Sequence, residues 1–303
     1  MNSFRLYFDS KKMSSSESLR LVLVTGAAGN IGKYFAEHAN KQKYKLRLMV
    51  HSTHELGKTE PLKSFGEIVQ GDLDQMNALD KVCKDVHTII HLAGDPDPSG
   101  TWDSLRKANI EGLYNIFLAA KKAGVKRMVY ASSIHAITGY PKDVQVKTNE
   151  PSNPGDLYGV TKCFGEALCR YMGEKEGVSS IAIRIGAFQD HSAARSKDSI
   201  DMMDAWLSQR DCVQLLERCI EAPEDLKFAI VHGLSNNTFN RMEIDSTRRL
   251  LGYDPQDNFF EESEAFKHLS MTDELAGHNV EDDRQKSGLR DKSSEDKKNE
   301  KKK

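Results

Sequence analysis

The chain has 303 residues, of which 38% are hydrophobic and 29% charged, with a formal net charge of −2. This nearly neutral balance gives no basis for a nucleic-acid partner, and no apolar run approaches the length of a membrane span, so we expect neither nucleic acid nor membrane as a partner. The five cysteines form no CxxC pair, which favours reduced thiols in a cytoplasmic protein and predicts no metal site.

The two ends of the chain differ from the middle. Residues 1–18 are rich in Ser and Lys, and residues 272–303 mix Lys with Asp and Glu and contain almost no apolar residue. Such segments cannot bury enough surface to offset their ordering entropy, so we expect both to be disordered. The folded domain is therefore predicted at 19–271.

Apolar runs alternate with helix-like segments through the first two thirds of that domain. The expected strands are 19–24, 45–50, 67–70, 86–92, 127–131 and 179–185, and the clearest expected helices are 105–123 and 157–175. This alternation predicts an α/β fold, a Rossmann-type doubly wound parallel sheet. Residues 187–200 are polar and are expected to be irregular. A helix at 209–222, a short strand at 227–231 and a helix at 242–251 are assigned with them to a small C-terminal substrate cap of about 187–260.

A glycine-rich loop joins the first strand to the first helix. Its glycines, at 26, 29 and 32, permit a tight turn and close approach of the backbone to a pyrophosphate, and Asn30 and Ile31 open the helix whose N–H groups favour an anion. This motif predicts dinucleotide binding. The glycines of the site are Gly26, Gly29 and Gly32.

The ends of the other strands complete the predicted cofactor site but leave the dinucleotide open between NAD and NADP. Val50 stands where NAD sites usually carry an acid, while His51 or Lys58 either faces a 2′-phosphate or is simply exposed. Asp72 is interpreted as an adenine contact or as a helix cap. The remaining cofactor residues are Leu73, Leu92, Ala93, Gly94, Tyr158, Lys162 and Ile185.

Tyr158 and Lys162 are four residues apart, on one face of the predicted helix. A tyrosine is a poor base at neutral pH, and a nearby ammonium together with the positive nicotinamide of an oxidised cofactor favours the phenolate. Ser133, after the fifth strand, is placed to hydrogen-bond the reacting oxygen. Asn109 is expected to hold a water or a backbone link in the proton path.

The segments TGAAGNIG, GDL, HLAG, YASSIH and YGVTK, with Asn109, together resemble an extended short-chain dehydrogenase/reductase. Within this family, the chain resembles the uronate dehydrogenase branch, which includes archaeal NAD-dependent glucose-6-phosphate dehydrogenases. The segments that carry this closer resemblance are HLAGDPDPSGTWDS, YASSIHAITGY, RIGAF and AWLSQRDC. The resemblance covers about residues 20–260. It implies that Ser133, Tyr158 and Lys162 are catalytic and that the ring C1 hydroxyl of a cyclic sugar is oxidised to a lactone. It also implies a homo-oligomer, formed through helices near 102–124 and 157–176.

Three positions depart from that branch: Ile134, Ala187 and Asp201 replace an Asn, a Ser and the Arg that holds the uronate carboxylate. Because an aspartate repels a carboxylate, a uronate is a less favoured substrate than an aldose or a sugar phosphate such as glucose 6-phosphate. His191, Arg195 and Lys197 offer a phosphate site, or only an exposed basic loop. The expected substrate residues are Asp95, Ser133, Ile134, His135 and Arg195.

Two other functions fit the same motifs. A nucleotide-sugar epimerase or dehydratase shares the fold and the Tyr-Lys pair, but the short segment after the sixth strand leaves little room for a nucleotide carrier. A cofactor-sensing protein without turnover is compatible with the three departures, whereas the intact Ser133, Tyr158 and Lys162 set favours an enzyme.

Overall fold

The computed structural model describes residues 19–51, 59–263 and 266. The two predicted disordered ends, 1–18 and 272–303, lie outside this range, as does Lys58.

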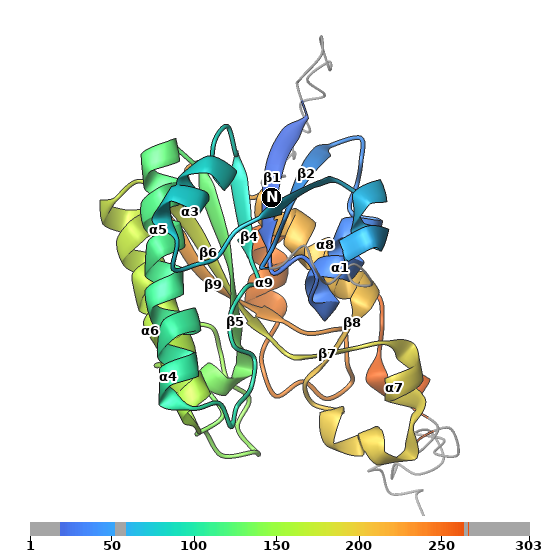
Figure 1. Cartoon of the computed structure of the whole chain (residues 1–303). Helices are drawn as coiled ribbons and strands as arrows, with labels where there is room; N and C mark the ends of the chain where they lie inside the picture. Colours follow the sequence, from blue (N-terminus) through green and yellow to red (C-terminus); the bar gives the residue numbers. More distant parts are fainter. Residues whose placement is uncertain (1–18, 52–58, 264–265, 267–303) are drawn as a thin grey trace, which may run out of the picture.

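A sheet of seven strands lies at the centre of the described part of the chain, and two further strands pair with each other outside it (Figure 1). Its spatial order is β3-β2-β1-β4-β5-β6-β9, and every neighbouring pair is parallel. The strands are β1 (Arg20–Thr25), β2 (Tyr44–Val50), β3 (Glu67–Gln70), β4 (Thr88–His91), β5 (Arg127–Ser133), β6 (Ser179–Ile185) and β9 (Phe228–Gly233). The order reverses between β1 and β4, which opens a crevice at the carboxyl ends of these strands. The predicted doubly wound parallel sheet is confirmed.

Helices cover both faces of the sheet, as Figure 1 shows. One face carries α1 (Asn30–His38) and α8 (Gln209–Ile220), and the other carries α3 (Met76–Val82), α5 (Gly112–Ala123) and α6 (Leu157–Lys175). Side chains of β1 alternate between the two resulting cores, with Val22 and Val24 in one and Leu23 in the other. Burial on both faces explains why the strands read as continuous apolar runs.

The helix expected at 105–123 begins earlier and is interrupted. It consists of α4 (Trp102–Leu105), a π-helical turn η2 (Arg106–Glu111) and α5. Thr101 caps the start by accepting a hydrogen bond from the Ser104 N–H. The π-turn adds a local widening that re-aims side chains, and it lies beside the crevice.

The segment after β6 differs from the prediction in two ways. Residues 187–200 are not irregular, because they form β7 (Ala187–Gln189), α7 (His191–Arg195) and the start of η4 (Lys197–Met202), and β7 pairs with β8 (Trp206–Ser208). The strand expected in the cap is β9, which joins the central sheet beside β6. The part of 187–260 outside the central sheet and its covering helix α8 is therefore smaller than the predicted cap.

The other described elements are short. They are η1 (Glu60–Ser64), η3 (Ile134–Ala136), α9 (Asp245–Leu251) and α10 (Phe259–Glu262). Among the described residues, no helix combines the length and the apolar character that crossing a bilayer requires. All five cysteines are free thiols, and four of them are buried.

Candidate active site

The loop after β1 has the geometry that pyrophosphate binding requires. Gly26 has φ +66°, and a Cβ there would lie 2.8 Å from the backbone N of Ala93, so no other residue fits without strain. A Cβ on Gly32 would lie 2.5 Å from the oxygen of Gly26. The N-cap residue of α1, Gly29, provides no side-chain cap, so the first N–H groups of the helix are left to an anion.

The ends of β2 and β3 border a second cavity of about 620 Å³ on the other side of this loop. His51 and Asp72 both line it, and the His51 Nε2 lies 2.9 Å from Asp72 Oδ2. Leu73, Asp74 and the backbone from Ala93 to Asp95 also line it. A cavity of this size, next to the phosphate loop, fits an adenosine.

The reactive residues converge on a cavity of about 420 Å³. Ser133 at the end of β5 and Tyr158 and Lys162 in the first turns of α6 line it. The same cavity is bordered by the phosphate-loop glycines, by Asn30 and Ile31, and by the segment from Leu92 to Asp95 and Ile185. The structure thus brings the predicted catalytic residues and most of the predicted cofactor residues into one site.

Tyr158 and Lys162 are both buried, and burial dominates their titration. Burial raises the pKa of Tyr158, the hydrogen bond from Ser133 partly offsets this, and the carboxylates of Asp156 and Asp95 raise it further. Burial lowers the pKa of Lys162 to about 8. The Lys162 ammonium donates to the Ala131 carbonyl at 2.9 Å and lies 5.3 Å from the centroid of the Tyr158 ring. The net effect of the protein groups is therefore to raise the pKa of Tyr158, whereas the expected stabilisation of the phenolate involves the nicotinamide of an oxidised cofactor together with Lys162.

Asn109 links the backbone of Asp95 to α6 through its side-chain amide. Its side-chain oxygen accepts from the N–H of Asp95 at 2.8 Å, and its amide donates to the Asp95 carbonyl at 3.0 Å and to Thr161 Oγ1 at 3.1 Å. Gly94 makes this approach feasible, because a Cβ there would lie 2.7 Å from the Asn109 oxygen. Asn109 on the π-turn therefore ties the loop after β4 to α6 and positions both walls of the site.

Two of the predicted substrate residues lie just beyond Ser133. The side chain of Ile134 points to a smaller neighbouring cavity of about 180 Å³. His135 packs edge-on against Tyr158, with ring centroids 5.4 Å apart, and its Nδ1 lies 2.5 Å from Asp156 Oδ2. The other oxygen of Asp156 caps α6 by accepting from the Gly159 N–H at 2.7 Å. His135 therefore positions Tyr158 through the start of its helix.

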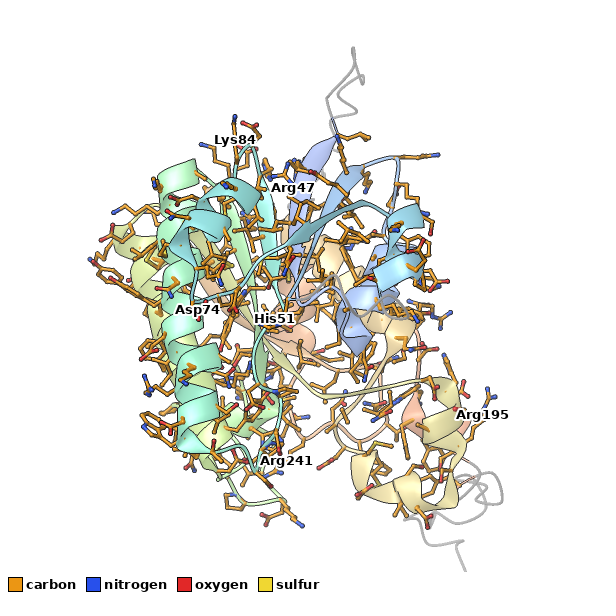
Figure 2. All side chains as sticks on the ribbon, in the orientation of Figure 1. Arg47, His51, Asp74, Lys84, Arg195 and Arg241 are labelled. Carbon is orange, nitrogen blue, oxygen red and sulfur yellow. The ribbon has the colours of Figure 1, made fainter. Side chains whose placement is uncertain are left out.

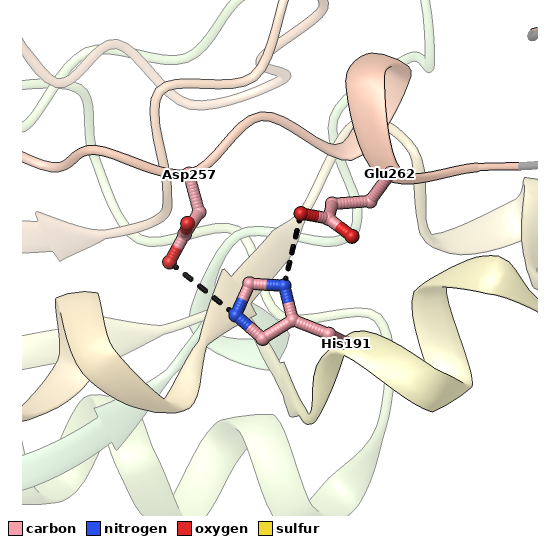
Figure 3. A group of neighbouring side chains, drawn as sticks. All are labelled: His191, Asp257 and Glu262. Atoms are coloured by element: carbon pink, nitrogen blue, oxygen red, sulfur yellow. Dashed lines mark ion pairs between the residues drawn. The ribbon is translucent and has the colours of Figure 1, made fainter.

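Two residues of the expected phosphate site, His191 and Arg195, lie against carboxylates away from the reactive cavity. Arg195 lies at the edge of the molecule on α7, apart from Arg241 below the strand ends (Figure 2), and it pairs with Glu262 at 2.8 Å. His191 also faces Glu262, at 3.1 Å, and Asp257 at 3.8 Å (Figure 3). Neither Arg195 nor His191 lines the reactive cavity. The side chain of Lys197 lies outside the described part of the structure.

His191, Asp257 and Glu262 are close enough together to suggest a cation site (Figure 3). Both carboxylates already have cationic partners, however, since Arg210 pairs with Asp257 and Arg195 pairs with Glu262. Ser208 also donates to Asp257 at 2.6 Å. The group is therefore an ion-pair network that joins α7 to α10 and to the segment just before it.

Sequence reasoning missed several residues that the fold brings to the site. Phe188 on β7 lines the reactive cavity, and Asp204 and Arg241 line the smaller cavity. Phe188 follows the RIGA segment directly, so its position just after β6 could have indicated in the sequence that it lies at the site. No sequence pattern indicates the same for Arg241, because it reaches the site through a backbone bridge between Val146 and Met242.

Comparison with known proteins agrees with this geometry. The model of the NAD dependent epimerase/dehydratase family matches residues 22–190, and the chain belongs to this family.

Several individual relatives are sugar dehydrogenases. The chain is 36% identical over 249 residues to an NAD-dependent glucose-6-phosphate dehydrogenase of Haloferax volcanii, covering 78% of this chain and 93% of the relative. It is 34% identical over 255 residues to a uronate dehydrogenase of Agrobacterium fabrum, covering 84% and 90%. Among solved structures, a uronate dehydrogenase variant from Agrobacterium tumefaciens complexed with NAD is similar, with a TM-score of 0.70, 31% identity, and coverage of 88% of this chain and 93% of that one.

Proposed function

We propose that this protein is an NAD(P)-dependent dehydrogenase that oxidises the C1 hydroxyl of a cyclic sugar to a lactone. The observation that carries the proposal is that Ser133, Tyr158 and Lys162 line one cavity with the phosphate-loop glycines. The sugar dehydrogenases among the relatives support the choice of substrate class.

The residues divide the work as follows. Ser133 has one hydroxyl proton to donate. Without a substrate it donates to the phenol oxygen of Tyr158, and with a sugar bound it donates to the reacting oxygen, which holds the sugar hydroxyl against the base. Tyr158 removes the hydroxyl proton, and Lys162, held by the Ala131 carbonyl, supplies a fixed donor beside the tyrosine ring. A dinucleotide bound along the phosphate loop supplies the hydride acceptor and a positive charge that favours the phenolate.

Replacement of the base tests this mechanism. Tyr158→Phe keeps the ring and the packing but removes the proton acceptor, so we expect turnover to fall by about a thousandfold or more while dinucleotide affinity changes only a few-fold. Tyr171→Phe is the matched control, because Tyr171 lies on the same helix but is exposed. The assay is the absorbance of reduced nicotinamide, with NAD and NADP in parallel and a panel of aldoses, uronates and glucose 6-phosphate. Retained turnover in Tyr158→Phe would remove the mechanism.

The two alternative functions fit the site less well. An epimerase or dehydratase acting on a nucleotide sugar needs space for a second nucleotide, and the cavity beyond Ser133 measures about 180 Å³. That volume is below the roughly 300–1,000 Å³ of sites for ligands of that size. A cofactor sensor does not need a buried lysine beside a buried phenol, because burying both groups costs free energy that binding alone does not require.

We further propose that NAD is preferred over NADP. His51 at the end of β2 is paired with Asp72, and Asp74 and Glu111 also line the adenosine cavity, whereas Lys107 is the lysine that lines it. Among the residues described there, carboxylates outnumber basic groups, and a 2′-phosphate would meet net repulsion.

A homodimer is proposed through the outer faces of α5 and α6. Tyr114 and Leu118 on α5 and Leu157, Val160 and Phe164 on α6 are exposed and recur every three, four or seven residues. Two adjacent helices with apolar outer faces suit packing against the same pair in a second copy. We also propose that the protein works in the cytoplasm, in keeping with its free thiols.

A further inference from the structure

A third, smaller cavity lies beside the reactive cavity, and the two are lined by different but neighbouring residues. It measures about 180 Å³. Ile134, which borders it, follows Ser133 directly, and Ala187, which also borders it, lies between Gly186 and Phe188 of the reactive cavity. These chain neighbours place the smaller cavity close to the position that the C1 of a sugar would take at Ser133 and Tyr158.

Three charged residues line this cavity: Asp201, Asp204 and Arg241. Within the described parts of the chain, neither carboxylate accepts a hydrogen bond or forms an ion pair. The guanidinium of Arg241 donates to two neutral groups, the carbonyl of Tyr140 at 2.6 Å and that of Thr138 at 3.3 Å. These bonds fix its orientation and use only one of its terminal nitrogens.

The backbone holds these groups in place. The N–H of Arg241 donates to the carbonyl of Asp204 at 2.8 Å, and its own carbonyl accepts from the N–H of Val146 at 2.8 Å. The three segments that contribute the wall, near 140, 204 and 241, are therefore joined by main-chain hydrogen bonds. These bonds fix the backbone at Asp204 and Arg241 before any ligand arrives, which lowers the entropy cost of binding.

The chemistry of this wall matches hydroxyl groups. A carboxylate only accepts hydrogen bonds and a guanidinium only donates them, whereas a sugar hydroxyl does both. Neighbouring hydroxyls can bond to Asp204 and Arg241 together, while Ile134, Ile137 and Met242 offer an apolar surface to the C–H face of the ring. Two carboxylates against one guanidinium leave a net negative wall, which repels a carboxylate or a phosphate.

We propose that Asp201, Asp204 and Arg241 bind hydroxyls at the end of the substrate remote from C1, and that the two aspartates select uncharged aldoses against uronates and sugar phosphates. This inference rests on the proposed sugar dehydrogenase function and names its substrate class.

Matched pairs of sugars test the selection. Glucose is compared with glucuronate and with glucose 6-phosphate, and galactose with galacturonate, by kcat/KM under identical conditions. We expect the neutral member to be preferred by about tenfold or more, and Asp201→Arg to shift that ratio toward the charged member by at least about tenfold, equivalent to about 1.4 kcal/mol. Asp198→Arg is the control, because it makes the same charge change on the same short helix, η4, but Asp198 does not line the cavity. A wild-type preference for the charged sugar, or an equal shift in Asp198→Arg, overturns the inference.

A binding measurement separates this inference from the proposed function. Galactose and galacturonate are titrated calorimetrically into the Tyr158→Phe variant saturated with NAD, where turnover is not needed. If no sugar reduces the dinucleotide in the wild-type enzyme, the proposed function fails, but tighter binding of galactose still supports the selection. Tighter binding of galacturonate, or binding of neither, overturns it.

Discussion

The ion pair between Glu166 on α6 and Arg184 on β6 offers the sharpest test of how the fold supports the site. Both side chains are buried, at 3% and 0% exposure, and two bonds of 2.9 Å join them. Ser132 also donates to Glu166 at 2.7 Å, next in the chain to Ser133. The pair therefore joins α6, the helix that carries Tyr158, to β6, and the bond from Ser132 joins the same helix to β5, the strand that carries Ser133.

Replacing one partner leaves the other charge buried. Glu166→Gln is expected to lower the free energy of unfolding by about 3–5 kcal/mol, the cost of breaking a buried pair. For a domain of this size, about 2–4 °C per kcal/mol converts this to a loss in Tm on the order of 10 °C. The measurement is thermal unfolding followed by circular dichroism, with urea unfolding as an independent readout.

Two companion variants isolate the cause. Glu174→Gln on the same helix removes an exposed carboxylate that pairs with Arg170 at 3.4 Å, and we expect a change below about 0.5 kcal/mol. Glu166→Leu combined with Arg184→Met removes both charges at similar volume and should lose less stability than Glu166→Gln. The reasoning is refuted if Glu166→Gln is no more harmful than Glu174→Gln, or if the double variant is the least stable.

Three further predictions concern pH, assembly and the cofactor. Burial lowers the pKa of His232 to about 4, so between pH 6.5 and 4 the unfolded chain binds a proton that the folded chain does not, and the free energy of unfolding should fall by about 3 kcal/mol as the pH falls through that window. His232→Asn should flatten this dependence in acid-series urea unfolding, whereas the exposed His38→Asn should leave it unchanged. Val160→Glu should convert a dimer to a monomer in sedimentation experiments, and Val144→Glu, an equally exposed valine elsewhere, should not; a wild-type monomer contradicts the proposed interface. Asp72→Asn removes a carboxylate beside the exposed histidine that ends β2, and it should raise kcat/KM with NADP relative to NAD by about tenfold; no change in this ratio would show that Asp72 does not set it.

The strand positions were predictable because they follow from burial. In a parallel sheet covered on both faces an inner strand is buried along most of its length, so residues 179–185 were assigned with their observed bounds. The edge strand at 67–70 was also assigned as observed, although Glu67 and Gln70 at its two ends are exposed. The helix at 157–175 was also assigned as observed, and the structure gives the reason for its bounds: Asp156 caps its start and Gly177 follows its end at φ +76°. The phosphate loop follows the carboxyl end of β1, and Tyr158 and Lys162 lie in the first turns of α6, so the topology brings the two motifs together at one cavity.

The substrate end was not predictable in the same way, because its elements are stabilised by contacts distant in sequence. β7 and β8 have three residues each, too few for a periodic pattern, and they exist because they pair with each other. Arg195 was assigned to the substrate from its charge alone, but its position on α7 gives it Glu262 as a partner.

Arg241 shows the physical reason most directly. A cation on an irregular segment has no local signal, and its place in the site depends on the bridge between Val146 and Met242, which joins two segments far apart in the chain.

The cofactor half of the site is built on consecutive β-α units, so each motif predicts its own position. The substrate half is assembled from three separate segments, so substitutions there change which sugar is accepted without disturbing the sheet. The placement of Tyr158 and Lys162 on α6 is therefore compatible with a substrate wall of this chain's own chemistry, and Asp201, Asp204 and Arg241, rather than the motifs, are the residues through which we propose to determine the substrate.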